Sequence, residues 1–292
     1  MSDEPGCLYV VSTPIGNLDD ISPRAVATLS SVSLILAEDT RHSRRLLDRY
    51  GIRVPLASHH EHNEASSTPR LVERLTAGES MALISDAGTP LLSDPGERLV
   101  SAAIAAGVRV IPIPGPSALL AALVASGIAA ERFTFFGFLP RKGRDRTATI
   151  DELVRLQHTG VVYEAPGRVA ATLAELAACG AGDRSAAVAR ELTKQFEEVR
   201  RGTVAELARY YQDSPPRGEV VIVLAGAEVA PMVLDEDAMR ARVGDLLAAG
   251  NSARDAARAL IAEYGVARND AYRLAHEAGS PAVAHESDPR SQ

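Results

Sequence analysis

Two short loops hold the residues whose types and spacing best suit ligand binding. They are Ser85–Pro90 and Pro114–Ser117, and each directly follows an apolar run typical of a buried strand. In an open α/β sheet, ligands bind beyond the carboxyl ends of the strands, where loops can turn backbone amides inward. Gly88 allows a close approach to the backbone, and Ser117 can cap a helix that begins at the next residue. The sequence therefore predicts a ligand site between these two loops.

The predicted site is not one of the common phosphate cradles. The first predicted strand is followed by Ser12–Leu18, which lacks the pattern G-x-G-x-x-G, and G-x-x-x-x-G-K-[ST] occurs nowhere in the chain. Dinucleotide and P-loop sites depend on these glycines, because they bring backbone amides onto phosphate groups. The sequence thus argues against both kinds of site.

Apolar runs alternate with helical patterns through the first part of the chain and predict the sheet that positions both loops. Such alternation is typical of a mostly parallel sheet covered by helices on both faces. A basic helix begins at Thr40, and Thr68 followed by Pro69 predicts the start of another. We expect this first α/β domain to span residues 1–116. Its predicted strands are Leu8–Val11, Leu34–Ala37, Met81–Ile84 and Val108–Ile113.

A second round of strands and helices predicts a second α/β domain over residues 117–230. Its last run, Val220–Leu224, is continuously apolar, as is typical of a strand buried on both faces. Alanine-rich helices are predicted over Val169–Ala178 and Val204–Tyr211, and we expect Arg141–Arg146 to form a basic loop. The other predicted strands are Phe133–Phe138, Val161–Glu164, Ala187–Glu191 and Glu198–Arg201.

The last part of the chain, residues 231–292, has a purely helical pattern. Helices are predicted over Asp237–Ala249, Ser252–Tyr264 and Arg268–Glu277, with glycine-containing turns between them. A helix, a tight glycine turn and a second helix are the signature of a helix-turn-helix unit. We therefore expect a small C-terminal helical domain, followed by a disordered tail beyond Gly279.

The composition predicts a globular, cytoplasmic protein. The chain has 292 residues, of which 46% are hydrophobic and 24% charged, enough to bury a large core. No segment has the roughly 18 unbroken apolar residues of a membrane span, and the first residues do not resemble a signal peptide. The net charge of −7 argues against sequence-independent binding to nucleic acid, so any such contact must be local.

No metal site is expected. The only cysteines, Cys7 and Cys179, lack metal-ligand spacing and are interpreted as packing residues. Three histidines fall within His59–Glu64, but no further ligands occur at zinc spacing.

Six motifs resemble, in order and spacing, those of the bacterial 16S ribosomal RNA (cytidine-2′-O)-methyltransferases. This family belongs to the tetrapyrrole methylase superfamily. The resemblance extends from about Leu8 to Ala225, and the C-terminal helices resemble the small helical domain of the same family. It implies two α/β domains with S-adenosylmethionine folded in a cleft between them, and a homodimer. The motifs are Ser12–Leu18, Ala37–Arg41, Ser85–Pro90 with Ser93–Gly96, Pro114–Ala118, Tyr163–Arg168 and Arg190–Lys194.

The resemblance also implies which residues bind the cofactor. A sulfonium ligand needs a mostly apolar cleft, a few backbone amides and nearby negative charge, and the chain offers that set. Where members that methylate porphyrin precursors have Gly-Gly-Asp-Pro, this chain has Ala87–Pro90, which favours an RNA substrate. The expected cofactor-binding residues are Pro14, Ile15, Gly88, Thr89, Leu92, Ser117, Ala118, Ala165, Pro166, Glu191 and Glu219.

Methyl transfer to a ribose 2′-hydroxyl requires aligned geometry and a group that accepts the proton. The available carboxylates at predicted strand ends are Glu38, Asp39 and Asp86, and the available amine is Lys194. We expect Asp39 or Glu38 to be the base. In the alternative interpretation, these two residues cap the basic helix that starts at Thr40, because acidic side chains stabilise a helix start.

Two basic clusters are candidate RNA contacts at the mouth of the cleft. Phosphate and ribose contacts by arginine would position the RNA, whereas the cleft would select the base. In the alternative interpretation, both clusters are ordinary solvated surface. The candidates are Arg41, Arg44 and Arg45 in the basic helix and Arg141, Lys142 and Arg144 in the basic loop.

The resemblance implies that the substrate is a cytidine at the decoding centre of the small ribosomal subunit, with the assembled subunit as the partner. Two other functions stay open. One is methylation of a tetrapyrrole, and the other is a ligand-sensing regulator in which Ser252–Glu277 binds DNA.

Overall fold

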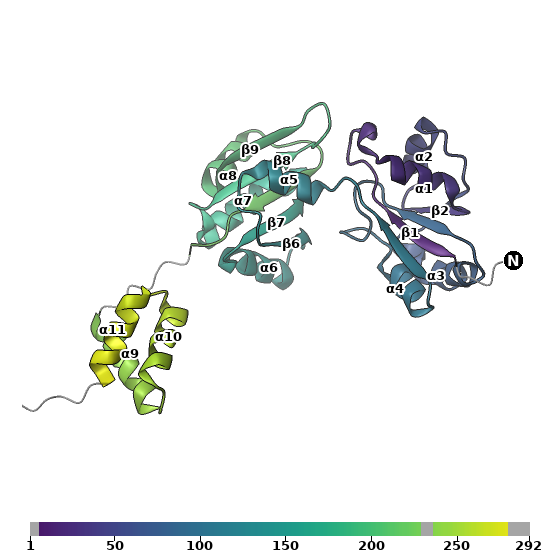
Figure 1. Cartoon of the computed structure of the whole chain (residues 1–292). Helices are drawn as coiled ribbons and strands as arrows, with labels where there is room; N and C mark the ends of the chain where they lie inside the picture. Colours follow the sequence, from purple (N-terminus) through teal and green to yellow (C-terminus); the bar gives the residue numbers. More distant parts are fainter. Residues whose placement is uncertain (1–5, 229–235, 280–292) are drawn as a thin grey trace, which may run out of the picture. The chain divides into compact units, whose positions relative to one another are not determined.

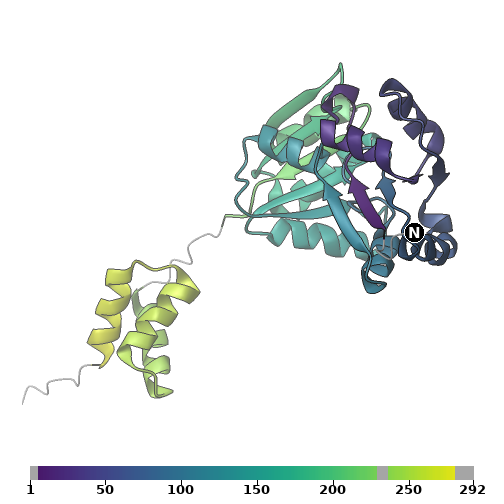
Figure 2. The same cartoon turned by 45° about the vertical axis from the view of Figure 1, so that its right-hand side comes forward.

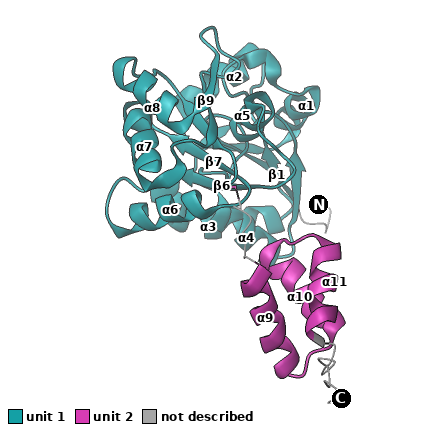
Figure 3. Cartoon of the chain, turned by 90° about the vertical axis from the view of Figure 1, so that its left-hand side faces the viewer, with its two compact units in different colours: residues 1–227 teal, residues 228–292 magenta. Residues whose placement is uncertain are grey.

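The computed structural model describes residues 6–228 and 236–279, and the chain forms two compact units (Figure 3). Unit 1 comprises residues 1–227 and contains two β-sheets (Figures 1 and 2), and unit 2 comprises residues 228–292. The expected boundary between residues 116 and 117 falls between the two sheets and stays a prediction. The expected boundary between residues 230 and 231, and the tail beyond Gly279, lie outside the described residues.

The first sheet of unit 1 is wholly parallel, as the alternating pattern predicts. Its strands are β1 (Cys7–Val11), β2 (Leu34–Ala37), β3 (Leu56–Ser58), β4 (Met81–Ile84) and β5 (Arg109–Ile113). They are ordered β3-β2-β4-β1-β5. Because all five strands run in the same direction, the loops after β1, β2, β4 and β5 emerge at one edge of the sheet.

Helices cover both faces of the first sheet (Figure 1). They are α1 (Pro23–Ser31), α2 (Thr40–Arg49), α3 (Glu61–Thr76) and α4 (Glu97–Ala105), and a 3-10 helix, η1 (Leu18–Asp20), precedes α1. Successive residues of β2 point to opposite faces. Ile35 packs with α1 and α2, and Leu36 packs with α3 and α4.

The second sheet of unit 1 is mainly antiparallel. Its strands are β6 (Phe133–Phe138), β7 (Thr159–Glu164), β8 (Ser185–Arg190), β9 (Glu198–Thr203) and β10 (Val220–Leu224). Their order is β6-β7-β10-β8-β9, and only β6 and β7 pair in parallel. All five residues of β10 are buried, as its continuous apolar run predicts.

Helices also cover both faces of the second sheet. α5 (Ala118–Ser126) packs on one face, and α6 (Arg144–Arg155), α7 (Val169–Leu176) and α8 (Val204–Asp213) pack on the other. The 3-10 helix η2 (Pro166–Arg168) precedes α7, and the π-helical turn η3 (Ala177–Ala181) follows it. Ile15, from the loop after β1, packs in the same core as α5. This side chain ties the loop after β1 to the second sheet.

Unit 2 is a three-helix unit with its own core. It contains α9 (Glu236–Ala248), α10 (Ala253–Tyr264) and α11 (Arg268–Gly279). Val243, Leu260 and Leu274 are fully buried in it. Gly265 ends α10 in the left-handed conformation, as the predicted glycine turn requires. No helix in the described parts of the chain is long and apolar enough to cross a membrane.

Two sequence predictions of local structure are wrong. α3 begins at Glu61 and not at Thr68, because Asn63 accepts the His60 N–H at 2.8 Å and so stabilises an earlier helix start. The basic segment Arg141–Arg146 is not entirely a loop, because α6 begins at Arg144. Burial of Ile150 and Leu153 against the second sheet explains this helix.

Candidate active site

A pocket of about 340 Å³ lies at the loops that follow β1, β4 and β5. The opposite wall comes from the end of β7 and the start of β10, which are paired neighbours in the second sheet. This pocket, called the first pocket, is within the size range of small-molecule sites. It is lined by Ile15, Asp86–Thr89, Leu92–Asp94, Ser117, Ala118, Phe138, Tyr163–Pro166 and Gly218–Val221.

Hydrogen bonds hold the loops of the first sheet against one another. Thr13 and Gly88 exchange backbone hydrogen bonds of 2.8 and 3.1 Å. The Thr89 hydroxyl lies 3.0 Å from the Ser12 hydroxyl and donates to the Pro116 carbonyl at 3.3 Å. Gly88 has φ +78°, and a Cβ at this position would lie 3.3 Å from Cγ2 of Ile15. The positive φ favours glycine here, and a larger side chain would also press against Ile15.

The loop after β4 stores backbone strain beside the pocket. Leu91 has φ 72° and Ser93 has φ 70°, values that non-glycine residues rarely adopt. Such strain concentrates at functional sites and persists only where the surrounding structure enforces it. Gly137 of β6 lies close by, because a Cβ there would come within 2.9 Å of the Ser93 hydroxyl. Gly137 also has φ +63°, so glycine suits this position through both its backbone conformation and its close approach to Ser93.

A buried carboxylate fixes the wall formed by the second sheet. Glu164 is 1% exposed. It accepts hydrogen bonds from the Ala165 N–H at 2.8 Å, from Nε of Arg168 at 2.7 Å and from the Thr172 hydroxyl at 2.6 Å. A buried charge is tolerated when it is paired and hydrogen-bonded in this way. The network positions Ala165 and Pro166 at the pocket.

Aromatic and apolar side chains form the rest of the wall. The Tyr163 hydroxyl accepts a hydrogen bond from the Leu119 N–H at 3.2 Å, so this side chain connects β7 to the start of α5. Phe138 packs edge-on against Tyr163 with ring centroids 5.5 Å apart. Phe138 is 58% exposed and Leu92 39% exposed. The pocket is thus bordered by accessible apolar surface.

Carboxylates concentrate negative charge at the carboxyl ends of β2 and β4. Burial raises the pKa of Asp94 to about 6, a hydrogen bond with Ser85 opposes this shift, and the charge of Asp86 adds to it. Burial also raises the pKa of Glu38, with further contributions from Asp86, Asp94 and Asp39. The Asp39 N–H donates to Oδ1 of Asp86 at 3.0 Å. A cation in the first pocket would be stabilised by this cluster.

Comparison with known proteins identifies the family. The family model of tetrapyrrole (corrin/porphyrin) methylases matches residues 7–208 of this chain. The chain is 46% identical over 274 residues to ribosomal RNA small subunit methyltransferase I of Synechocystis, covering 93% of this chain and 98% of the relative. It is 48% identical over 273 residues to the protein of the same name from Pseudomonas aeruginosa, covering 92% and 96%.

The chain belongs to the tetrapyrrole methylase family. It is a methyltransferase, and S-adenosylmethionine is its methyl donor, as the sequence predicts. Its fold resembles that of uroporphyrin-III C-methyl transferase from Thermus thermophilus complexed with S-adenyl homocysteine. The TM-score is 0.54 at 19% identity, covering 75% of this chain and 97% of the other. The mixed α/β architecture expected from the sequence is therefore confirmed.

Nine of the expected cofactor-binding residues line the first pocket of this methylase. Asp94, Tyr163 and Phe138 line it too but were missing from the expected set, although Asp94 and Tyr163 lie within the six family motifs. Pro14 lines a neighbouring pocket, and Glu191 lines neither. The nine residues are Ile15, Gly88, Thr89, Leu92, Ser117, Ala118, Ala165, Pro166 and Glu219.

A second pocket of about 300 Å³ adjoins the first. The two pockets share Ile15, Asp86, Ala87 and Glu219 in their linings, so ligands in the two would meet there. The loop after β1 and one face of α2 form most of the second pocket. Its lining comprises Thr13–Gly16, Leu18, His42, Ser43, Arg45, Leu46, Ser85–Ala87, Lys194 and Glu219.

Asp39 of the methylase caps α2. Its carboxylate accepts from the Arg41 N–H at 2.8 Å and from the His42 N–H at 3.4 Å, and it forms an ion pair with the Arg41 guanidinium at 3.2 Å. These hydrogen bonds with Arg41 lower the pKa of Asp39. Asp39 lines neither pocket, and neither does Glu38. For Asp39, the geometry agrees with the helix-cap interpretation.

Lys194 lies in the second pocket between two carboxylates. Its Nζ is 2.9 Å from Oε1 of Glu191 and 3.2 Å from Oε2 of Glu219. Burial lowers the pKa of Lys194, but its interactions with Glu191 and Glu219 outweigh burial, so the net shift is upward. The amine is therefore charged near neutral pH. Oε1 of Glu191 also accepts the Glu219 N–H at 3.1 Å, so Glu191 organises this corner from outside the pocket.

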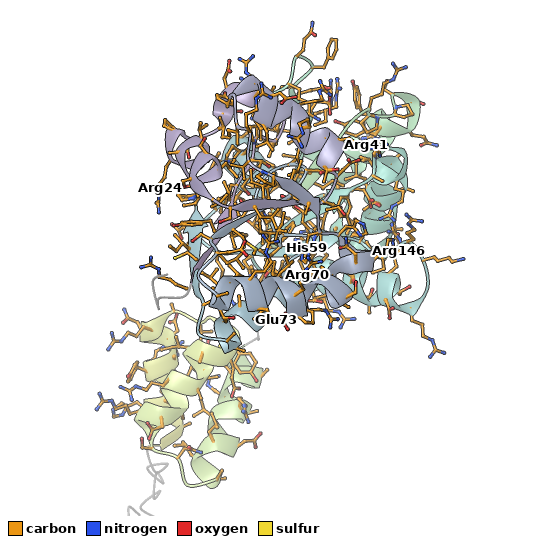
Figure 4. All side chains as sticks on the ribbon, turned by 90° about the vertical axis from the view of Figure 1, so that its right-hand side faces the viewer. Arg24, Arg41, His59, Arg70, Glu73 and Arg146 are labelled. Atoms are coloured by element: carbon orange, nitrogen blue, oxygen red, sulfur yellow. The ribbon has the colours of Figure 1, made fainter. Side chains whose placement is uncertain are left out.

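The basic candidates differ in their surroundings. Arg45 lines the second pocket, whereas Arg44 is exposed outside both pockets. Arg41, which is labelled in Figure 4, forms an ion pair with Asp39. Arg141 and Lys142 are exposed before α6, and Arg144 is its exposed first residue. The next arginine, Arg146, bonds Glu175 and Thr172 in the scaffold of the second sheet.

His59 of the histidine cluster is part of the scaffold. His59 is fully buried beside α3 (Figure 4), and its Nδ1 lies 3.1 Å from the Ser67 hydroxyl. Burial lowers the pKa of His59. Glu64, 3.9 Å from Nε2 of His59, accepts the Arg98 N–H at 2.9 Å and thereby caps α4. These contacts connect α3 to α4 and give His59 a structural role.

Proposed function

We propose that this methylase transfers a methyl group from S-adenosylmethionine to the 2′-hydroxyl of a cytidine in 16S ribosomal RNA, at the decoding centre of the small subunit. The observation that carries the proposal is the similarity, over more than nine tenths of the chain, to proteins named ribosomal RNA small subunit methyltransferase I. The six sequence motifs support the choice of a cytidine 2′-hydroxyl. An enzyme with this substrate works where ribosomes are assembled, which places it in the cytoplasm.

The first pocket fits S-adenosylmethionine. Its wall is mostly apolar and suits the body of the ligand. Its strand-end loops contain glycine and small residues, so the ligand can approach their backbone closely. Asp86 and Asp94 supply negative charge at the same loop. When bound, S-adenosylmethionine supplies an electrophilic methyl group on a sulfonium. We assign the nine lining residues named above, with Pro14 and Glu191 at the adjoining corner, to its binding.

Asp86 is the residue best placed to accept the proton of the ribose hydroxyl. It alone among the proposed catalytic residues lines both pockets, where the donor and the acceptor would meet. Its Oδ1 is oriented by the Asp39 N–H. Glu38 keeps negative charge next to Asp86, Asp39 holds the start of α2, and charged Lys194 orients Glu191 and Glu219.

A loss of turnover on replacing Asp86 would distinguish catalysis from binding. We expect Asp86→Asn to lower the turnover of saturated enzyme by about 10²- to 10⁴-fold, the contribution typical of a positioned acid or base. The amide oxygen keeps an acceptor for the Asp39 N–H, so the fold and the affinity for S-adenosylhomocysteine should change little. Glu38→Gln is the matched control, and an equal loss of turnover in both variants would remove the assignment to Asp86.

A second copy of this chain is the partner we propose for α5. One side of this helix packs on the second sheet, and the other exposes Leu120 to 50% and Val124 to 76%. Exposed apolar side chains of this size on one helix are typical of an interface between subunits.

The RNA would be contacted by Arg44, Arg45, Arg141, Lys142 and Arg144, with Arg41 at the start of α2.

Labelled S-adenosylmethionine tests the proposed function. The purified chain is offered small ribosomal subunits, deproteinised 16S RNA and a porphyrinogen in parallel, and the modified nucleotide is identified by mass spectrometry. We expect the label on the ribose of one cytidine and the highest rate with assembled subunits. Label on the porphyrinogen would favour the tetrapyrrole function. Specific binding of duplex DNA without transfer of label would favour the regulator.

A further inference from the structure

We propose that the second pocket binds the acceptor nucleotide and that Arg45 and Ser43 of α2 hold it there by a phosphate group and a hydroxyl. This inference rests on the proposed function and adds a nucleotide subsite to it. The first observation is an unsatisfied polar atom. Ser43 is 3% exposed and lines the second pocket, and its Oγ has no hydrogen-bond partner in the described structure. Buried hydroxyl groups are nearly always hydrogen-bonded, so a ligand in this pocket can supply the partner that the protein does not.

The second observation is an arginine side chain that has no carboxylate partner. The arginines at the two ends of α2 are neutralised, Arg41 by Asp39 at 3.2 Å and Arg49 by Asp19 at 2.5 Å. Arg45 lies between them, lines the second pocket and, within residues 6–228 and 236–279, forms neither an ion pair nor a side-chain hydrogen bond. A guanidinium binds phosphate through two parallel hydrogen bonds. Arg45 is therefore available for a phosphate group of a nucleotide.

The third observation is where the two pockets meet. A ligand in the second pocket reaches the first pocket at Ile15, Asp86, Ala87 and Glu219, so its reacting atom would lie beside Asp86. A ribose hydroxyl at this junction faces the methyl donor, while the adjacent phosphate extends toward α2. Lys194 does not compete for the phosphate, because Glu191 and Glu219 already bind its amine.

Arg44 provides the matched control on the same helix. It neighbours Arg45 in sequence, is also exposed and carries the same charge, but it does not line the second pocket. A general electrostatic attraction of RNA to α2 would make the two arginines equivalent. A nucleotide subsite makes Arg45 necessary and Arg44 dispensable for a ligand as small as one nucleotide.

The experiment uses the full chain with S-adenosylhomocysteine bound and cytidine 3′,5′-bisphosphate as the probe. We compare wild type, R44A, R45A, R45K and S43A by calorimetry. Loss of a hydrogen bond to a charged partner weakens binding by about ten- to a hundredfold, and we expect a loss of this size in R45A. R45K should recover part of it, S43A should weaken binding by a few-fold, and R44A should bind as wild type does. Affinity for S-adenosylhomocysteine and melting temperature should stay unchanged in all variants.

Methylation of small subunits gives a second measurement. In single-turnover experiments at saturating subunits, we expect R45A to slow methyl transfer by at least tenfold, and R44A to change only the subunit affinity. Equal probe binding by R44A and R45A, or no probe binding by wild type at millimolar concentration, overturns the inference. If wild type methylates subunits while R45A and R44A behave alike, only the nucleotide subsite fails. If wild type methylates no ribosomal RNA, the proposed function itself fails.

Discussion

We predict that the carboxyl group of Asp94 makes the affinity for S-adenosylmethionine depend on pH. Burial raises its pKa to about 6, the hydrogen bond with Ser85 opposes the shift, and the negative charge of Asp86 adds to it. Asp94 lines the first pocket, and a sulfonium is attracted by the ionised carboxylate but not by the neutral acid. The proton that Asp94 holds at low pH must therefore leave when the cation binds. Affinity should rise with pH through about 6.

The pKa of Asp94 sets the size of the effect. If only the ionised form binds, the apparent affinity scales with the ionised fraction. With a pKa of about 6, this fraction is about one eleventh at pH 5 and about ten elevenths at pH 7, so the dissociation constant should fall about tenfold between them. The stability of the ligand-free protein has the opposite dependence. The native state keeps a proton that the unfolded chain releases above about pH 4, so the free energy of unfolding falls as pH rises from about 4 to 6.

Calorimetry with two ligands measures the effect. S-adenosylmethionine and S-adenosylhomocysteine are titrated between pH 5 and pH 7. The homocysteine compound lacks the sulfonium charge, so its affinity should be nearly flat. Asp94→Asn should abolish the tenfold change. Glu38→Gln should keep it, although the pKa of Glu38 is also raised, by burial and by Asp86, Asp94 and Asp39. An equal pH dependence for both ligands, or one that persists in Asp94→Asn, would refute the reasoning.

Three further predictions concern the pocket, the helix cap and the domains. Gly88→Val should abolish calorimetric binding of S-adenosylmethionine, because the added side chain meets Ile15 and enters the pocket. Gly107→Val, at the similar φ of +76° but with no atom within 4 Å of its Cβ, should cost stability and leave affinity unchanged. Asp39→Asn keeps a hydrogen-bond acceptor for the start of α2 and should retain methylation, whereas Asp39→Ala should lower the melting temperature. If Asp39→Asn is stable but loses turnover, Asp39 is the base. A chain ending at Ala227 should melt cooperatively and bind S-adenosylmethionine, because unit 1 has its own cores. If this shortened chain methylates small subunits as fully as the whole chain does, unit 2 has no docking role.

The strands could be predicted where burial dominates. β2, β4 and β10 consist wholly of buried residues and have the predicted bounds, because each is a continuous apolar run that fits a sheet core. β6 also has the predicted bounds, which its aromatic residues indicated, although none of its residues is buried. β3 was missed because it has only three residues and none is buried. α6 was missed because charged residues and Gly143 dominate its start, whereas the residues that anchor it, Ile150 and Leu153, pack against segments distant in sequence.

The direction of strand pairing in the second sheet was not visible in the sequence. A buried apolar run such as β10 is compatible with parallel or antiparallel neighbours, since its residues are covered on both faces in either case. β10 pairs antiparallel with both β7 and β8. This places the start of β10 beside the end of β7 and so brings Glu219 next to Ala165 at the pocket. The resemblance to the methyltransferase family predicts that Glu219 and Ala165 belong to one site, whereas the local sequence pattern alone does not predict it.

The candidate site could be predicted as far as it depends on neighbours in sequence. The helix-cap interpretation of Asp39 needed only the pattern around Thr40, and the loops after β4 and β5 needed only the strand ends. Asp94 and Ser43 are different, because what distinguishes them is burial produced by other segments. A serine inside a basic helix has no special meaning until its hydroxyl is enclosed beside a pocket.

Contacts between loops of the two sheets explain how the pockets keep their shape. A Cβ on Gly16 would lie 2.4 Å from Cγ of Lys194, and the Asn17 N–H donates to the Thr193 hydroxyl at 3.0 Å. Glu191 and Thr193 have positive φ values of 49° and 64°, a strain that these contacts offset. The loop after β8 is therefore held against the loop after β1 by close packing and by a hydrogen bond. Contacts within the protein thus position Lys194 and Glu219 in the pocket that Asp86 also lines, which favours alignment of the reacting atoms.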